Sequence, residues 1–169
     1  MRLALSFLSF FCSGISLISC SETNSDKNQS DKKNEHFIDT SSVAIISFDK
    51  KGNWPFDNKY RPANLSQHDL LEVDSLFRQC ALNYNETLPE NLKESYGIDF
   101  KKYDYKRQYV AVLNNRGEKE VWVNCFCNTW DSRWKKELFL VEDGGNCFFN
   151  LKINLTTKKC FDVSVNGYA

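Results

Sequence analysis

The sequence is poor in histidine, a residue that many metal centres and hydrolytic sites use. Its 169 residues include two histidines, three prolines and one methionine. Structural zinc sites need sets of cysteine and histidine at characteristic spacings, and a nucleophilic cysteine needs a base held beside it. The chain also has no G-x-S-x-G, G-x-G-x-x-G or P-loop motif. We therefore expect no metal, no cofactor and no enzymatic activity.

Net charge is lacking as well. The 22 basic and 22 acidic residues give a formal net charge of zero. Proteins that bind nucleic acid usually present a basic face or stripe, so we expect no nucleic-acid partner. Hydrophobic residues make up 41% of the chain and aromatic residues 14%. This composition is sufficient for a packed interior and argues against general disorder.

The long uncharged apolar run of the sequence lies at its start. Arg2 precedes a stretch from Leu3 to Ile18 that contains no charged residue. The stretch is short for a transmembrane helix, and polar sequence follows at once, which is typical of the apolar region of a signal peptide. It ends in Leu17-Ile18-Ser19-Cys20, which resembles the lipobox of bacterial lipoproteins.

This resemblance implies a lipid-anchored protein. Residues 1–19 would be removed as a signal peptide, a diacylglycerol would be attached to the thiol of Cys20, and the new amine would be acylated. A single acyl chain binds a membrane only weakly, whereas several chains anchor stably. We expect the bacterial cell envelope, with the outer membrane preferred and the domain outside the cytoplasm. The alternative is a plain secretory leader that happens to end in cysteine.

A polar segment separates the lipidated cysteine from the rest of the chain. Residues 21–36 read SETNSDKNQSDKKNEH and contain no apolar side chain. Such a segment cannot bury enough surface to offset its chain entropy, so we expect residues 20–36 to form a disordered tether. A flexible coil of this length reaches about 20–25 Å. The remaining residues, 37–169, are expected to form a single globular domain.

The hydrophobic pattern of this domain predicts an α+β fold. Ser66 begins a capping box followed by helical periodicity, and beyond Tyr105 the period changes to two. The predicted elements are a strand over 43–48, a helix over 67–84, one hairpin of 108–113 with 120–127, a second of 137–141 with 147–155, and a strand over 161–165. Together they predict one main helix packed on an antiparallel sheet of about five to six strands, a layout that resembles the cystatin-like folds.

The turns set the expected registers. With Arg116-Gly117 at the tip of the first hairpin, Leu113 faces Glu120. The expected core face of that hairpin is then Val110, Val112, Val121, Val123, Cys125 and Cys127. In the second hairpin Leu140 faces Phe149. For the last strand we prefer the register that places Ile153 opposite Phe161, because it aligns the apolar residues.

Five cysteines remain in the domain: Cys80, Cys125, Cys127, Cys147 and Cys160. Export to an oxidising compartment allows disulfides, and an odd number leaves at least one cysteine without a partner in the chain. The expected register places Cys147 and Cys160 on opposite faces, so these two should not bond. We favour reduced cysteines that pack as small hydrophobes. The alternative is a small thiol-dependent enzyme or redox protein that uses Cys125 and Cys127.

Aromatic residues outside the core pattern give a candidate binding surface. They lie in two predicted loops, and exposed aromatic rings often mark binding surfaces. The candidate residues are Trp54, Phe56, Tyr60, Trp130, Asp131, Arg133 and Trp134. A flat ring beside a carboxylate and a guanidinium suits a sugar or a peptide. In the alternative interpretation, which we prefer, these rings cover the ends of the sheet.

Two further resemblances bear on function. Gln108-Tyr-Val-Ala-Val112 is similar to the Q-x-V-x-G stretch of cystatins, which implies a protease-inhibitor-like module, although Val112 replaces the glycine. Residues 109–169 resemble small envelope lipoproteins of Gram-negative bacteria, which implies no particular activity. We therefore expect a non-enzymatic envelope lipoprotein that is held to a membrane by its lipid and binds an envelope protein or polymer.

Overall fold

The computed structural model describes residues 39–51 and 55–168, all within one compact unit. The predicted signal peptide, Cys20, the tether and Trp54 lie outside the described residues. In chain order the elements are β1 (Val43–Ile45), β2 (Arg61–Pro62), α1 (Gln67–Thr87), a 3-10 turn (Glu90–Leu92), α2 (Lys93–Tyr96), β3 (Lys106–Leu113), β4 (Lys119–Phe126), 3-10 turns at Ser132–Lys135 and Gly145–Cys147, β5 (Phe148–Asn154) and β6 (Lys159–Val165). No helix among the described residues is long and apolar enough to span a membrane.

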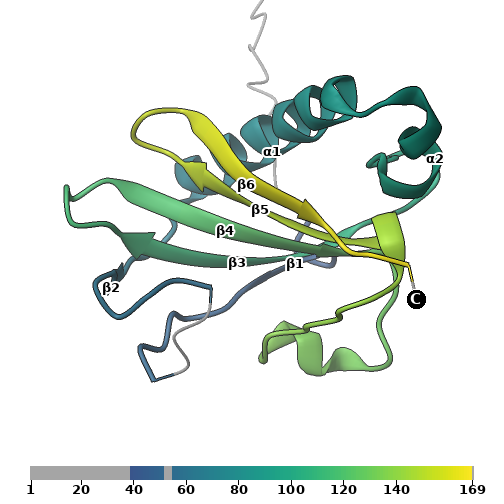
Figure 1. Cartoon of the computed structure of the whole chain (residues 1–169). Coiled ribbons are helices and arrows are strands. Elements are labelled where there is room, and N and C mark those ends of the chain that lie inside the picture. The colour runs from purple at the N-terminus through teal and green to yellow at the C-terminus, as the bar shows by residue number, and fades with distance from the viewer. Residues whose placement is uncertain (1–38, 52–54, 169) are drawn as a thin grey trace, which may run out of the picture. The chain divides into compact units, whose positions relative to one another are not determined.

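The fold is α+β, with one main helix packed on a six-stranded sheet, as predicted (Figure 1). The strand order is β1-β3-β4-β5-β6, and the short β2 pairs with the end of β3. All neighbours are antiparallel except β1 and β3, which run parallel. The sheet is therefore mixed, and the expectation of a wholly antiparallel sheet is wrong at this edge.

Helix α1 begins where its sequence predicts. The side chain of Ser66 accepts a hydrogen bond from the amide of Asp69 at 3.1 Å, and the Asp69 carboxylate accepts from the amide of Ser66 at 2.8 Å. This capping box satisfies two backbone donors that the first turn would otherwise leave without partners. The helix ends at Thr87, shortly before Pro89, which cannot continue it. Val73 and Phe77 are among the side chains that it buries.

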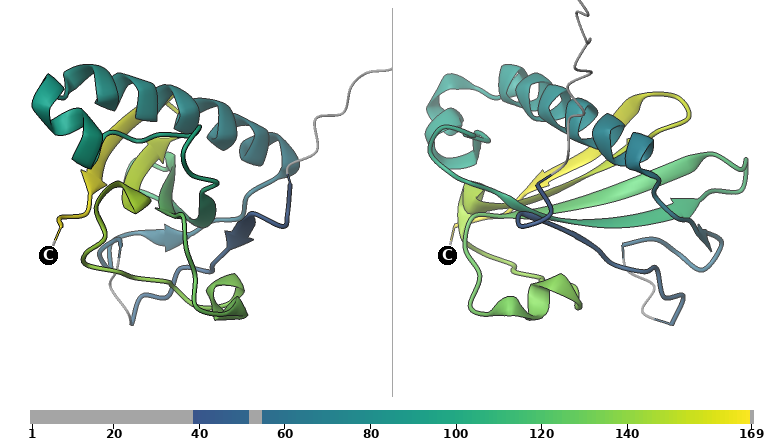
Figure 2. Two further views of the ribbon diagram at one scale, coloured as in Figure 1. Left: turned by 90° about the vertical axis from the view of Figure 1, so that its right-hand side faces the viewer. Right: turned by 180° about the vertical axis from the view of Figure 1, so that it is seen from behind.

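Both faces of the sheet are covered. Helix α1 lies on one face, which we call the inner face, and residues 46–51, 55–60 and 127–147 lie across the other, the outer face (Figures 1 and 2). Tyr109, Val121 and Val123 belong to the inner core, whereas Val112 and Trp122 belong to the outer core. Strands β3 and β4 are therefore buried almost throughout, which explains their nearly continuous apolar sequences.

The first hairpin forms, but its register differs by one residue from the prediction. Leu113 pairs with Lys119 and Val112 with Glu120. The side chain of Asn114 organises the turn, because its Oδ1 accepts from the amides of Arg116 and Glu118. The shift places Val110 and Val112 on the outer face. Apolar periodicity cannot fix a register when both faces are buried, and this explains the error.

The second predicted hairpin does not form. Residues 137–141 contain no strand, and β5 pairs instead with β4 and β6. The apolar run around Leu138 and Phe139 packs on the outer face of the sheet. A short apolar run has the same appearance in sequence whether it is a strand or a loop that covers a sheet, and the prediction chose the wrong one.

Strand β6 follows two registers in turn. Near the hairpin Ile153 pairs with Cys160, and beyond a β-bulge Phe149 pairs with Val165. Asp162 lies at the bulge with a φ of 53°. The preferred register therefore holds only beyond the bulge. Cys160 consequently faces the inner core and forms a disulfide with Cys80 of α1, so the expectation that it faces outward is wrong. The expectation of reduced cysteines holds for Cys125 and is wrong for the other four.

Candidate binding surface

The connection between β4 and β5 forms a loop that a disulfide closes. Cys127 and Cys147, 20 positions apart, bond at the base of residues 128–146. The loop crosses the outer face of the sheet and carries the 3-10 turn at Ser132–Lys135 (Figure 1). Most of the candidate residues identified in the sequence lie on this loop, namely Trp130, Asp131, Arg133 and Trp134.

Two side-chain amides of the sheet hold this loop in place. Gln108, which is fully buried, donates to the carbonyl oxygens of Trp134 and Glu137, both at 2.6 Å. Its own oxygen accepts from the amide of Phe139 at 2.9 Å. Asn124 lies opposite on β4 and donates to the carbonyl of Phe139 at 2.7 Å. The sheet is thus hydrogen-bonded to the loop backbone at Trp134, at Glu137 and at both the amide and the carbonyl of Phe139.

The candidate aromatic residues divide into interior and surface residues. Trp134 is buried and meets Phe126 edge to face, with ring centroids 5.5 Å apart. Phe56 is also buried and packs against Tyr60, which is half-buried. Trp134 and Phe56 therefore fill the outer core and do not contribute to an exposed surface. For these two rings the interpretation that they cover the sheet holds.

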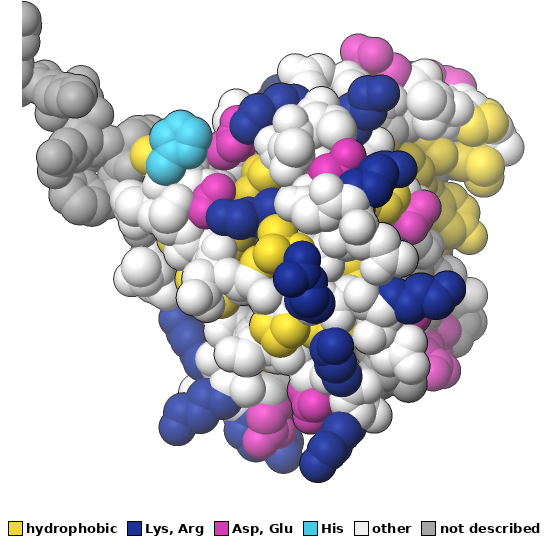
Figure 3. Space-filling view, turned by 90° about the vertical axis from the view of Figure 1, so that its left-hand side faces the viewer, with side chains coloured by type: hydrophobic (Ala, Val, Ile, Leu, Met, Phe, Trp, Pro, Cys, Tyr) yellow, Lys and Arg dark blue, Asp and Glu magenta, His cyan; other side chains and the backbone are white. Residues whose placement is uncertain are grey.

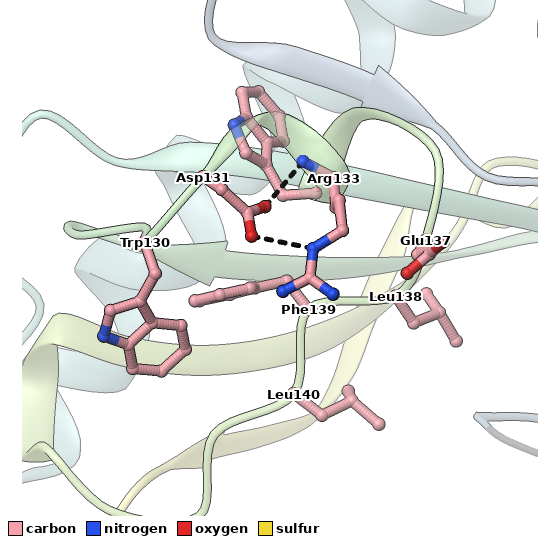
Figure 4. Close-up of a pocket in the computed structure, with 8 residues that line it drawn as sticks. Trp130, Asp131, Arg133, Glu137, Leu138, Phe139 and Leu140 are labelled. Atoms are coloured by element: carbon pink, nitrogen blue, oxygen red, sulfur yellow. Dashed lines mark hydrogen bonds and ion pairs between the residues drawn. The ribbon is translucent and has the colours of Figure 1, made fainter.

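Trp130 is the exposed ring of the loop, with 75% of its surface accessible. One side of it packs on Phe139, at a centroid distance of 4.8 Å and an interplanar angle of 47°. Leu140 lines the same cavity and is 52% exposed. We call Trp130, Phe139 and Leu140 the aromatic patch. Figure 4 shows the three side chains on neighbouring stretches of the same loop.

Asp131 and Arg133 form a fixed pair next to the aromatic patch. The carboxylate of Asp131 accepts from the backbone amide of Arg133 and from its Nε, both at 2.7 Å. These hydrogen bonds lower the pKa of Asp131, and the same carboxylate raises the pKa of Arg133. Figure 4 shows the two terminal nitrogens of the guanidinium turned away from Asp131 and toward Phe139.

A shallow cavity of about 230 Å³ lies between these groups. The aromatic patch forms one side of it, and charged side chains form another. Its lining residues are Trp130, Asp131, Arg133, Trp134, Glu137, Leu138, Phe139 and Leu140. The sequence identified four of these eight. It gave no reason to select Phe139 and Leu140, because the run 137–141 was assigned to a strand.

The cysteines proposed for thiol chemistry do not form a common site. Cys127 is bonded to Cys147, and Cys125 is a fully buried thiol on the inner face. Burial raises the pKa of Cys125 well above the usual value, and a thiol in that state is a poor nucleophile. The cystatin-similar stretch is equally inaccessible, because Gln108 lies inside the sheet.

Charges of both signs are mixed over the surface around the strand tips. Lys119 pairs with Asp69 at 2.8 Å, and Lys158 pairs with Glu72. Figure 3 shows lysine and arginine side chains on this face with aspartate and glutamate among them. Within the described part of the chain, no group of three or more histidine, cysteine, aspartate or glutamate side chains could hold a metal ion.

The geometry of the loop is the available guide to function. Comparison of the chain with protein-family models, with curated proteins and with solved structures finds no match.

Proposed function

We propose that this protein is a lipid-anchored component of the bacterial cell envelope that binds an envelope protein or polymer and catalyses no reaction. The observation that carries the proposal is the exposed ring of Trp130 on a loop that cannot easily move. The loop is closed by the disulfide between Cys127 and Cys147 and bonded to the sheet by Gln108.

An exposed tryptophan on a fixed loop calls for an explanation. Removing a large aromatic ring from water normally lowers the free energy of the protein. A flexible loop could therefore fold such a ring against the protein. Here Phe139 holds one side of Trp130, and the hydrogen bonds of Phe139 to Gln108 and Asn124 fix that support. The remaining surface of the ring is thus presented to solvent, in the way that anchor residues of binding sites are before a partner arrives.

The two disulfides support the envelope location. Cys80–Cys160 and Cys127–Cys147 link distant parts of the domain. Such bonds form and persist in oxidising compartments and are rare in the cytosol. They agree with the apolar leader that ends at Cys20, although they are a separate kind of observation. An enzymatic alternative has less support, because Cys125 is buried and has no base described near it.

Mass spectrometry of the mature protein tests the anchor. The protein would be expressed in a bacterial host and recovered from the membrane fraction. We expect an N-terminal peptide that begins at Cys20 and carries the mass of a diacylglyceryl group and an amide-linked acyl chain. A Cys20→Ser variant should keep its leader or be released from the membrane. A mature chain with an unmodified Cys20 would contradict the proposal.

Site-specific photocrosslinking in intact cells tests the binding surface. A photoreactive residue in place of Trp130 should give discrete adducts with an envelope protein or polymer. The matched control is the same residue in place of Leu82, which is 53% exposed on α1. Adducts at both positions, or at neither, would show that the aromatic patch is not a specific binding surface.

A further inference from the structure

We propose that the cavity beside Trp130 is a subsite for one sugar ring of a neutral glycan. This inference rests on the proposed binding function and adds the chemical class of the partner. Three features of the site carry it: the flat exposed indole, the mixture of donors and acceptors beside it, and the small size of the cavity.

The indole of Trp130 suits the apolar side of a sugar. The face of an aromatic ring carries partial negative charge, and the C–H groups on one side of a pyranose carry partial positive charge. The two surfaces are flat and of similar width, so they can stack with little loss of conformational freedom. Phe139 packs beside the indole at an interplanar angle of 47° (Figure 4), and most of the indole surface stays exposed for a ligand.

The polar groups suit hydroxyls better than an anion. The cavity is lined by one guanidinium, Arg133, and by two carboxylates, Asp131 and Glu137. The Nε of Arg133 already donates to Asp131, so an anion meets a positive charge that is compensated. Glu137 provides a second carboxylate in the lining that can accept from a ligand. A hydroxyl both donates and accepts. It can therefore use the terminal guanidinium nitrogens and a carboxylate oxygen together.

The dimensions suit one residue of a longer chain. Pockets for drug-sized ligands usually enclose about 300–1,000 Å³, and this cavity encloses about 230 Å³. It lies at the surface of the loop beside Leu140, which is exposed. A polymer can therefore place one ring in the cavity and continue over the loop. Peptide anchors usually fill deeper apolar pockets, which the charged rim of this cavity does not provide.

Binding measurements with defined saccharides test the inference. The acylated protein would be held in a zwitterionic detergent, because detergents with sugar headgroups would compete. The probes are neutral tetrasaccharides of glucose, mannose, galactose or N-acetylglucosamine, with tetrapeptides of neutral, acidic and basic composition for comparison. We expect at least one tetrasaccharide to bind by isothermal titration. Its affinity should change less than twofold between 50 and 500 mM salt, because the ligand is uncharged.

Variants connect the binding to the site. Trp130→Ala should weaken saccharide binding by about tenfold or more, and Trp130→Phe, which keeps a flat ring, should weaken it by less than about fivefold. Glu137→Gln keeps an acceptor and should have a similarly small effect, whereas a cationic ligand would lose most of its affinity. Leu82→Ala on α1 is the matched control and should leave the affinity unchanged.

The outcomes separate this inference from the function on which it rests. Binding of peptides alone, with loss in Trp130→Ala, would overturn the glycan inference and leave the binding function in place. Saccharide binding that Trp130→Ala does not reduce would also overturn the inference. The absence of saccharide binding together with position-specific crosslinks at residue 130 would overturn the glycan inference and leave the binding function in place. The absence of both would overturn the inference and the proposed function together.

Discussion

The side-chain amides of Gln108 and Asn124 face each other across β3 and β4, with 3.1 Å between the Asn124 nitrogen and the Gln108 oxygen. Between them they bond the backbone of the loop at Trp134, Glu137 and Phe139. A buried primary amide has two donor hydrogens and an oxygen with two lone pairs. Gln108 uses all of them, so the position of the aromatic patch depends on a residue far inside the sheet.

Replacement of Gln108 by leucine should destabilise the domain by about 2–4 kcal/mol. The variant leaves the carbonyls of Trp134 and Glu137 and the amide of Phe139 without partners beneath the loop, and buried polar groups without partners are costly. Urea unfolding of the purified protein measures the change. Gln79→Leu is the matched control, because Gln79 is exposed and bonds only to Asn83. Equal effects of the two substitutions would contradict the role of Gln108.

Alanine substitution of the two tryptophans of the loop should change stability to very different extents. Trp134 is buried against Phe126, and its loss should lower the free energy of unfolding by about 3–5 kcal/mol. Trp130 is mostly exposed, and its loss should change stability by less than about 1 kcal/mol. Thermal and urea unfolding of both variants would test this. A large loss of stability in Trp130→Ala would mean that the ring is structural.

The disulfides should differ in their contribution to stability. The chain-entropy relation gives about 4.5 kcal/mol for the bond that spans 80 positions and about 3 kcal/mol for the bond that spans 20. We expect Cys80→Ala with Cys160→Ala to be the more destabilised pair in urea. Cys127→Ala with Cys147→Ala should leave the core folded but should weaken ligand binding, because the base of the loop is no longer closed. A pair with unchanged stability would show that its bond is absent in solution.

The sequence determines local structure here better than it determines the pairing of strands. The capping box at Ser66 and the apolar repeat behind it depend on neighbouring residues, and both were correctly predicted. The register of β3 with β4 depends on residues 46–51, 55–60 and 127–147, which cover the outer face. Because that cover lies far away in sequence, the apolar pattern of the strands alone cannot reveal which valines face α1.

The binding surface was only partly accessible to sequence analysis for a related reason. Trp130 and Trp134 are four positions apart in the same polar loop, and nothing local distinguishes the exposed ring from the buried one. Gln108 did carry a signal, because it is a polar residue next to an apolar strand run. A buried glutamine needs partners, and this requirement points to a loop across the sheet. No comparable feature of the sequence indicated the bulge at Asp162.

Acid should destabilise the domain in part through Asp69. Burial opposes its ionisation, but hydrogen bonds from Lys119 and Ser66 outweigh this effect and lower the pKa of Asp69 from 3.8 to about 2. A lowered pKa gives stability that is complete above the unfolded pKa and is lost as the pH falls from about 4 to about 2. After allowance for solvent screening we expect about 1–2 kcal/mol from this group. Asp69→Asn should show a shallower loss of stability between pH 5 and pH 2 than the parent protein.

A second acidic group provides the control for this measurement. The pKa of Glu118 is lowered to about 2 by hydrogen bonds from Arg116, Asn114 and Asn154. Glu118 therefore titrates in the same range, and it precedes Lys119, the residue that pairs with Asp69 of the helix cap. Glu118→Gln should also reduce the acid sensitivity, and the double variant measures how far the two neighbouring groups are coupled through Lys119. Parallel pH profiles for Asp69→Asn and the parent protein would contradict the assignment.

Cys125 should resist modification as long as the domain is folded. Its side chain is fully buried on the inner face, so a reagent cannot reach the thiol. Burial also keeps its pKa high, so little of the reactive thiolate is present. Iodoacetamide at pH 8, followed by peptide mapping, should leave Cys125 unmodified in native protein and should modify it completely in guanidinium chloride. Cys80, Cys127, Cys147 and Cys160 should remain unmodified in both conditions unless a reductant is added. The time course also distinguishes the remaining alternative: rapid modification of native Cys125 would indicate an accessible, activated thiol and would restore thiol chemistry as a candidate function.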